Sequence, residues 1–400
     1  MVFRFEGYSI DAERRELRRG AELIETEPQV FDLLIFLIRN RDRVVSKDDL
    51  LDAVWNGRIV SESTLTSRIN AARRAINDSG AEQRLLKTIA RKGFRFVGDV
   101  VDHPGPTPAM PPRQDVSGPT PVPRQEVQFC TAPDGVRIAY ATVGTGPPLV
   151  KTANWLNHLE YDWQGPIWRH LLHALAARYR LIRYDERGNG LSDWDVDDIS
   201  LDAFVSDLES VVDASGLKTF PLFGISQGCA VAIAYAVRHP ERVSRLVLYG
   251  GYARGRRKRG GQTDIEQADA LLTLMRQGWG QQNPAYRQIF TSQFIPDANA
   301  GQIHWFNELQ RTTTLPENAV RIRRALDEID VSQLLPQIRV PVLVLHCRDD
   351  AVQPFEEGRR MAAGIAGSRF VALEGRNHVL LEQEPAWERF LEEVTRFLAS

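Results

Sequence analysis

The sequence predicts an α/β protein in two domains: a small helix-turn-helix domain, then a doubly wound parallel sheet with a helical cap. Three observations predict this arrangement. Amphipathic helices follow a short alternating stretch near the N-terminus, a proline-rich segment comes next, and strand and helix patterns alternate in the rest. We place the first domain at residues 1–101, a linker at 102–125, the second domain at 126–400 and its cap at about 252–335.

The composition restricts the functional classes. The chain has 400 residues, a net charge of −2 and three cysteines. A nearly neutral charge argues against a protein that binds nucleic acid over its whole surface, so any basic face has to be local. Widely spaced cysteines without a Cys-x-x-Cys pair favour free thiols in a reducing compartment, and we expect neither a metal ion nor a cofactor. The sequence shows no signal-peptide pattern and no apolar run of membrane-spanning length, so we expect a cytoplasmic location.

The first domain shows a sheet pattern followed by helix signals. Apolar residues alternate over residues 3–10, which indicates a small N-terminal sheet. Pro28 opens a first helix, because a missing N–H costs nothing in a first turn. Ser46 is the expected N-cap of a second helix whose first turn carries acidic residues. Two helices in this order indicate a helix-turn-helix.

A third helix, from about Glu62 to Asn77, has one apolar face and one polar, basic face. The apolar face contains Leu65, Ile69, Ala72 and Ile76. The opposite face contains Ser63, Ser67, Asn70 and Arg74, flanked by Thr66, Arg73 and Asn77. Residues 85–97 then alternate like a hairpin, with Arg91 and Lys92 at its tip. The excess of basic residues across this region indicates a face that binds phosphates.

Order, pattern and residues together resemble the winged helix-turn-helix DNA-binding domain of OmpR/PhoB-type response regulators, also found in ToxR/CadC-like regulators. The resemblance implies a third helix in the major groove and a hairpin wing in the minor groove of double-stranded DNA. It places Ser67 and Asn70 at base edges, and it places Arg91 or Lys92 in the wing. Ser63, Arg73 and Arg74 would contact bases or phosphates.

One departure from that family lies at the wing. The family usually has an Arg-Gly pair at the entry to the turn, whereas this chain has Ala90 and Arg91 there. The alternative function for the basic face is a solvated surface that contacts another protein.

The segment from His103 to Arg124 is dense in proline. Proline at this density cannot enter helices or sheet ladders and favours an extended, semi-rigid chain. We interpret the segment as an interdomain linker. A proline-rich ligand for another protein is the alternative.

The second domain is organised around the sequence T-F-P-L-F-G-I-S-Q-G-C-A at residues 219–230. An apolar strand leads into a sharp turn at Ser226, and a buried helix follows. A strained central residue requires neighbours without a Cβ, which Gly224 and Gly228 supply. The turn exposes the Ser226 hydroxyl and places the Gln227 amide at a helix N-terminus, where it can donate to an oxyanion. The alternative is a glycine-flanked turn with an ordinary serine.

A serine nucleophile needs a base and an orienting acid. Asp350 follows a late strand and His378 follows the last strand, which is the chain order expected for such a triad. Asp349 is the alternative acid, and His378 could instead be a surface histidine. His346 and His158 do not follow the final strand, so we interpret them as packing or pocket residues.

This order of serine, acid and histidine resembles the α/β-hydrolase superfamily over the whole second domain. The sequence Y-D-E-R-G-N-G-L-S at residues 184–192 is similar to the loop of haloperoxidase-like esterases. The family usually has His-Gly after its first long strand, whereas this chain has T-A-N-W at residues 152–155. The expected second oxyanion donor is therefore Asn154 or Trp155.

Two features near the predicted cap have more than one interpretation. The basic run R-G-R-R-K-R at residues 254–259 is expected to be a solvated, mobile loop, with an anionic ligand or DNA as alternative partners. Five tryptophans are expected at the pocket mouth or in the cap, or else in the core: Trp155, Trp163, Trp168, Trp279 and Trp305.

We therefore expect a cytoplasmic, dimeric transcription regulator whose hydrolase domain binds or slowly hydrolyses a small acyl ester, lactone or thioester. Without a membrane span or a receiver pattern, the signal would enter through the hydrolase fold. Dimerisation is expected because paired half-sites multiply affinity. The alternatives are an active serine hydrolase with the winged helix as a tether, and a scaffold with a vestigial triad.

Overall fold

The computed structural model describes residues 2–11, 16–20, 22–24, 26–47, 49–50, 54, 62–80, 82–89, 92–103, 125–281 and 283–400. The chain divides into two compact units, Met1–Gly118 and Pro119–Ser400. Each unit has its own cluster of buried hydrophobic side chains.

The first unit begins with an antiparallel sheet of five strands in the order β4-β3-β2-β1-β7. The strands are β1 Val2–Phe5, β2 Tyr8–Asp11, β3 Glu16–Arg19, β4 Glu22–Ile24 and β7 Val101–His103. Strand β7 pairs with β1, so the sheet of the first unit includes His103, two residues past the predicted domain end. The observed sheet is therefore larger than the one predicted from the two apolar, alternating strands at residues 3–10.

Helix α1 (Pro28–Arg39) packs on α3 (Glu62–Ala75), and the hairpin of β5 (Leu86–Ile89) and β6 (Gly93–Phe96) follows. Pro28 lies in the first turn of α1, as the sequence predicts. Ser46 Oγ accepts a hydrogen bond from Asp49 N at 3.0 Å, which is the predicted N-cap contact. Most of the predicted second helix falls outside the described residues.

The second unit is built on an eight-stranded sheet in the order β15-β14-β13-β12-β10-β11-β9-β8. Strand β9 pairs antiparallel with both β8 and β11, and all the other pairs in the sheet are parallel. The strands are β8 Glu126–Thr131, β9 Arg137–Val143, β10 Pro148–Lys151, β11 Arg180–Tyr184, β12 Phe220–Ile225, β13 Val243–Tyr249, β14 Val342–Cys347 and β15 Arg369–Leu373.

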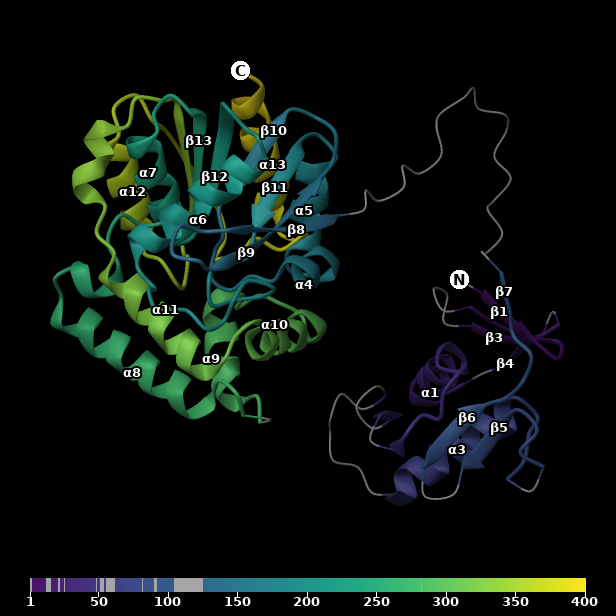
Figure 1. The fold of residues 1–400 in the computed structure, drawn as a ribbon. Helices are drawn as coiled ribbons and strands as arrows, with labels where there is room; N and C mark the ends of the chain where they lie inside the picture. The colour runs from purple at the N-terminus through teal and green to yellow at the C-terminus, as the bar shows by residue number, and fades with distance from the viewer. Residues whose placement is uncertain are drawn as a thin grey trace, which may run out of the picture. The chain divides into compact units, whose positions relative to one another are not determined.

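Helices cover both faces of this sheet (Figure 1). One face carries α6 (Leu201–Ala214), α7 (Gly228–Arg238) and α12 (Phe355–Gly364). The other face carries α5 (Arg169–Ala176) and α13 (Pro385–Ala399), which meet where His170 packs against Trp387. The short helix α4 (Leu159–Gln164) precedes α5. This is the doubly wound arrangement that the strand and helix alternation predicts.

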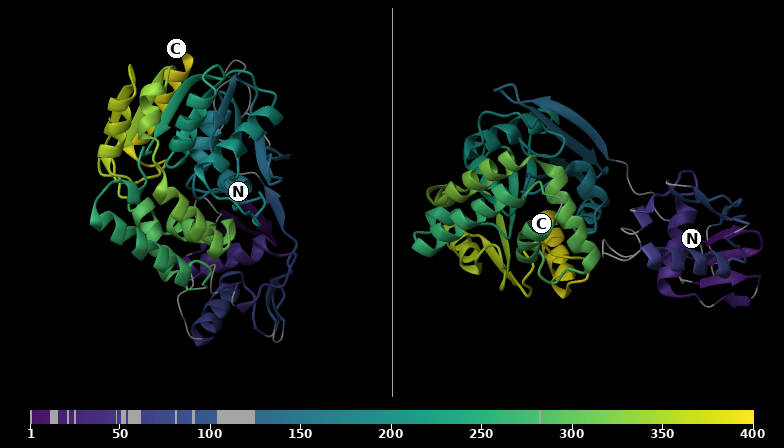
Figure 2. Two further views of the ribbon diagram at one scale, coloured as in Figure 1. Left: turned by 60° about the vertical axis from the view of Figure 1, so that its left-hand side comes forward. Right: turned by 90° about the horizontal axis from the view of Figure 1, so that it is seen from below.

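Four helices between β13 and β14 form a cap that lies together at one end of the sheet (Figure 2). They are α8 Gln262–Gly278, α9 Ala285–Phe294, α10 Ala300–Thr313 and α11 Pro316–Glu328, accompanied by the 3-10 helices η1 Arg256–Lys258 and η2 Ser332–Gln337. Asn299 and Gln302 form a capping box at the start of α10, which explains where that helix begins.

Within the described ranges, no helix combines the length and the apolar character that a membrane span requires.

Candidate active site and DNA-binding face

The turn between β12 and α7 holds Ser226 in a left-handed backbone conformation, with φ of +56°. A non-glycine residue pays strain energy for such a conformation, on the order of 1–3 kcal/mol. A Cβ on Gly224 would lie 2.8 Å from Cys229 Cα, and one on Gly228 would lie 2.4 Å from Thr152 Oγ1. Both contacts are too short, so the glycines on either side of Ser226 are required by packing as well as by the turn.

Ser226, His378 and Asp350 form a continuous hydrogen-bonded chain. His378 Nε2 lies 2.9 Å from Ser226 Oγ, and His378 Nδ1 lies 2.7 Å from Asp350 Oδ2. Asp350 Oδ1 accepts from the amides of Val352 and Gln353 at 2.8 and 2.9 Å. Burial raises the pKa of Asp350, but the interaction with His378 and these amides outweigh it, so the pKa lies below its usual value.

The alternative residues lie elsewhere. Asp349 is exposed, and the carboxylate that contacts His378 belongs to Asp350. His346 is buried, with Nε2 3.0 Å from the carbonyl oxygen of Gln353, and burial lowers its pKa. His158 caps α4, where Nδ1 accepts from Tyr161 N. The structure therefore brings together the three residues that the sequence selects.

The predicted oxyanion donors differ in their availability. Gln227 is the N-cap of α7, so its amide belongs to the helix end, where backbone N–H groups lack a partner within the helix. The Trp155 amide already donates to Gln227 Oε1 at 2.8 Å. The Asn154 side chain accepts from Lys151 Nζ and donates to the Leu156 carbonyl at 3.4 Å. The amide of Trp155 and the side chain of Asn154 are thus both used within the protein. The backbone amide of Asn154 stays the predicted second oxyanion donor.

The Gln227 side chain is held from its other end by Glu186. Gln227 Nε2 donates to Glu186 Oε1 at 3.2 Å, and both residues are buried. Burial raises the pKa of Glu186 to about 8, with a smaller contribution in the same direction from Asp207. Glu186 belongs to the loop at residues 184–192, whose Arg187 forms a fully buried ion pair with Asp207 at 2.6 Å. This loop therefore positions Gln227.

The cavity beside Ser226 is narrow and aromatic. The space between its lining atoms is too narrow for a water-sized molecule, and the walls are Trp155 and Trp168 together with Phe294 and Phe306 from the cap. Trp279 stacks on Trp155 with ring centroids 5.5 Å apart. Trp163 packs against His173, and Trp305 stacks on Tyr161, so these two tryptophans do not line the cavity. Two of the five tryptophans thus belong to the pocket wall.

Hydrogen bonds connect the cap to the loop that carries the catalytic base, His378. The backbone N–H of His378 donates to the carbonyl oxygen of Phe294, the last residue of α9, at 2.9 Å. The Asn377 side chain accepts from Asp297 N at 3.0 Å. The loop that carries the histidine is therefore hydrogen-bonded to the cap at two points.

A buried charged cluster beneath the site has no obvious signal in the sequence. Lys151, Asp162 and Arg183 are all buried, and Arg183 lies 3.7 Å from Asp162. Burial is the largest influence on each of these groups, and it lowers the pKa of Lys151 and raises that of Asp162. The one sequence clue is a lysine in the apolar strand β10. Its amine holds Asn154, so the cluster shapes the loop at residues 152–155.

The basic run at residues 254–259 differs from the expected solvated loop. Arg254 pairs with the buried Glu357 at 2.7 Å, and Arg259 donates to Gln353. Residues Arg256–Lys258 form η1, where Arg257 and Lys258 are also ion-paired. The expectation was wrong because carboxylates from α8, α11 and α12 lie close to these residues in the fold.

In the first unit, the polar face of α3 is exposed at Ser67, Asn70 and Arg74. Lys92 is exposed in the hairpin turn. The side chain of Ser63 and all of Arg91 lie outside the described residues.

The position of Arg73 differs from the prediction that it belongs to the DNA-binding face. Its side chain is buried, and its guanidinium donates to the Leu86 carbonyl at 2.9 Å and to Thr88 Oγ1 at 2.8 Å. Arg73 therefore joins α3 to β5 and does not reach bases or phosphates, whereas its neighbour Arg74 points to solvent.

Asp78, an acidic residue in the turn after α3, is also buried. Its carboxylate accepts from the amides of Ser79, Arg84, Leu85 and Leu86. Burial raises its pKa, but these four hydrogen bonds outweigh that effect and lower it. Asp78 thus organises the turn after α3.

The fold and the site define a hydrolase of the α/β type joined to a DNA-binding domain of transcription regulators. The model of the alpha/beta hydrolase fold matches residues 158–385, more than half of the chain. The chain therefore belongs to the alpha/beta hydrolase family. Residues 20–96 match the family described as "Transcriptional regulatory protein, C terminal", so the predicted fusion with an OmpR/PhoB-type winged helix is confirmed.

The relatives are hydrolases and related enzymes. The chain is 28% identical over 257 residues to the AB hydrolase superfamily protein YisY of Bacillus subtilis, covering 60% of this chain and 88% of that protein. It is 29% identical over 285 residues to the non-heme chloroperoxidase CPO-A1 of Kitasatospora aureofaciens, covering 68% and 98%. An esterase from Exiguobacterium antarcticum superposes with a TM-score of 0.58 at 27% identity, covering 68% and 99%.

Proposed function

We propose that this protein is a cytoplasmic, dimeric transcription regulator that binds double-stranded DNA through its winged helix and senses a small molecule through its hydrolase domain. The signal is a small, partly apolar acyl ester, lactone or thioester, because the cavity beside Ser226 is aromatic. Ser67, Asn70, Arg74 and Lys92 contact DNA in this proposal, since they are exposed on α3 and in the wing.

The proposed chemistry follows from the triad. Ser226 Oγ attacks the carbonyl carbon of the ester while His378 Nε2 takes the hydroxyl proton. Asp350 orients the imidazole and stabilises its positive charge. The carbonyl π electrons move to oxygen to form a tetrahedral intermediate. When this intermediate collapses, the C–O bond to the alcohol breaks, and the alcohol leaves with the proton from His378. Water then attacks the acyl-serine carbonyl while His378 takes its proton. When the second tetrahedral intermediate collapses, the bond to Ser226 Oγ breaks, the acid leaves and His378 returns the proton to Ser226.

The observation that carries the sensor function is the hydrogen bond from the Trp155 amide to Gln227 Oε1. A single N–H cannot serve this acceptor and a developing oxyanion at once. Loss of one oxyanion donor costs roughly 3–4 kcal/mol of transition-state stabilisation. Slow turnover with retained binding is what a regulator requires of its ligand domain.

The second candidate is a working serine hydrolase for which the winged helix is a tether. The observation that favours it is the complete hydrogen-bonded chain from Ser226 to Asp350.

Three measurements on the full-length protein separate the candidates. A fluorophosphonate probe tests whether Ser226 is nucleophilic, with Ser226→Ala as control. Burst and steady-state hydrolysis of p-nitrophenyl butyrate then measure turnover. Fluorescence anisotropy with operator DNA selected from a random library, with and without ester, measures regulation. Labelling with slow turnover and an ester-dependent change in DNA affinity supports the sensor. Fast turnover with no effect on DNA binding supports the tethered enzyme.

A further inference from the structure

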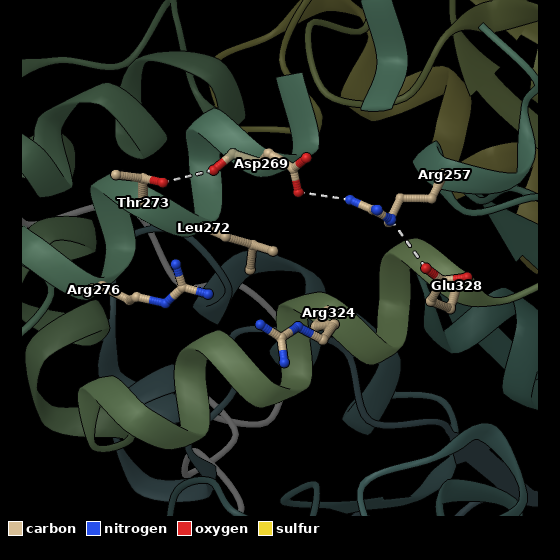
Figure 3. A pocket seen from close by; sticks show the side chains of 7 residues that line it. All are labelled: Arg257, Asp269, Leu272, Thr273, Arg276, Arg324 and Glu328. Atoms are coloured by element: carbon tan, nitrogen blue, oxygen red, sulfur yellow. Dashed lines mark hydrogen bonds and ion pairs between the residues drawn. The ribbon is translucent and has the colours of Figure 1, made fainter. Parts of the chain in front are cut away.

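A second pocket lies in the cap, between η1, α8 and α11 (Figure 3). It contains about 710 Å³ of space, part of which is open to solvent. Three arginines line it, Arg257 from η1, Arg276 from α8 and Arg324 from α11. The buried side chain of Leu272 supplies an apolar part of the wall.

The two acidic residues of this pocket are already neutralised. Arg257 contacts Asp269 at 2.7 Å and Glu328 at 3.0 Å. Lys258 contacts the second carboxylate oxygen of Glu328 at 2.8 Å. The carboxylates therefore hold η1 against α8 and α11, and they leave no negative charge for further cations.

Arg276 and Arg324 are the remaining charges. Figure 3 shows both guanidinium groups directed into the space between α8 and α11. Among the described residues, which in the cap exclude only residue 282, neither side chain forms a hydrogen bond or an ion pair. Two positive charges that face one pocket repel each other, and the repulsion is relieved when an anion lies between them.

We infer that this pocket binds the anionic group of a small molecule, a phosphate or a carboxylate, between Arg276 and Arg324. Guanidinium groups suit this role because their planar pairs of N–H donors match the oxygens of both anions. Leu272 contacts an apolar part of the same molecule. The site is separate from Ser226, since the two pockets share no lining residue. It does not depend on hydrolytic activity.

Isothermal titration of the full-length protein at low ionic strength tests the inference, with pyrophosphate as the phosphate probe and citrate as the carboxylate probe. Saturable binding of at least one probe is expected. Arg276→Ala/Arg324→Ala should weaken it at least tenfold, because each charge-assisted hydrogen bond contributes roughly a factor of ten or more. Arg276→Lys/Arg324→Lys, which keeps the charges but loses the paired donors, should weaken it less.

The matched control is Arg359→Ala/Arg396→Ala, which removes two exposed arginines on α12 and α13. Binding should be unchanged in this control, and circular dichroism should show that all variants are folded. No saturable binding, or an equal loss in the control, would overturn the inference. So would a result in which Arg276→Ala/Arg324→Ala weakens binding to duplex DNA but leaves both probes unaffected, because the arginines would then serve DNA.

Discussion

The backbone amide of Trp155 donates to the side-chain oxygen of Gln227, the residue that follows Ser226. The side chain next to the nucleophile thus occupies one of the two backbone amides that the sequence offers as oxyanion donors. Glu186 fixes this arrangement from the other end of the Gln227 amide.

Replacing Gln227 by methionine should therefore increase ester hydrolysis. Methionine has a similar length and no strong acceptor, so the Trp155 amide becomes available to the oxyanion. We expect kcat for p-nitrophenyl butyrate to rise by roughly tenfold or more, since one such donor is worth about 10²–10³ in rate. The control is the same substitution in a Ser226→Ala background, which should be inactive. A rate at or below that of the wild type would show that this amide does not limit catalysis.

Asp350 and the adjacent Asp349 allow a matched test of which carboxylate orients His378. Asp350→Asn should reduce kcat by roughly 10³–10⁴, because an amide stabilises the wrong tautomer of His378 and cannot stabilise its positive charge. Asp349→Asn should leave kcat within about twofold, since Asp349 is exposed. Steady-state kinetics on both variants checks this, and an equal loss in both would contradict the assignment of Asp350.

Glu186 should make stability depend on pH. Its pKa is raised to about 8 from 4.5, so between these values the folded protein binds more protons than the unfolded chain. Stability from this group is full at low pH and is lost as the pH rises through about 8. The loss is on the order of a few kcal/mol.

Glu186→Gln removes this titration and serves as the test. Urea unfolding at pH 5.5, 7 and 8.5 should show the variant gaining stability relative to the wild type as the pH rises. Glu374→Gln, at an exposed position, is the control and should show no such trend. A parallel pH dependence for Glu186→Gln and the wild type would contradict the raised pKa.

Arg73 and Arg74 should separate stability from DNA binding. Arg73→Ala leaves the buried Leu86 carbonyl without its donor and should destabilise the first unit by about 1–3 kcal/mol. Arg74→Ala should leave stability unchanged but weaken DNA binding and reduce its salt dependence by about one phosphate contact. Denaturant unfolding and anisotropy titrations at several salt concentrations measure the two effects. Loss of DNA affinity without loss of stability in Arg73→Ala would show that Arg73 contacts DNA after all.

The features that the sequence predicts well are those determined by local backbone geometry. The turn around Ser226 is one, because the two glycines that it requires lie within five consecutive residues. The doubly wound sheet is another, because each strand is an apolar run between helices. Strands β3, β4 and β7 are not predicted, since each has only three or four residues and contains at least one charged residue.

The features that the sequence does not predict depend on contacts between distant segments. The role of the Gln227 side chain depends on the approach of a loop 72 residues earlier in the chain. Helical periodicity places Arg73 beside Arg74 on an outer face, but the Arg73 side chain turns inward and donates a hydrogen bond to the carbonyl oxygen of Leu86 in β5. Lys151 in β10 is buried, and the favourable charge of Asp162 beside it comes from α4, a later segment of the chain.

The hydrogen bond from the His378 backbone to Phe294 has a mechanical consequence. Phe294 also lines the narrow space beside Ser226. We therefore expect a molecule that enters this space to displace Phe294 and, through the same hydrogen bond, the peptide that carries the imidazole. Ligand binding and the alignment of the catalytic base would then be coupled through the end of α9.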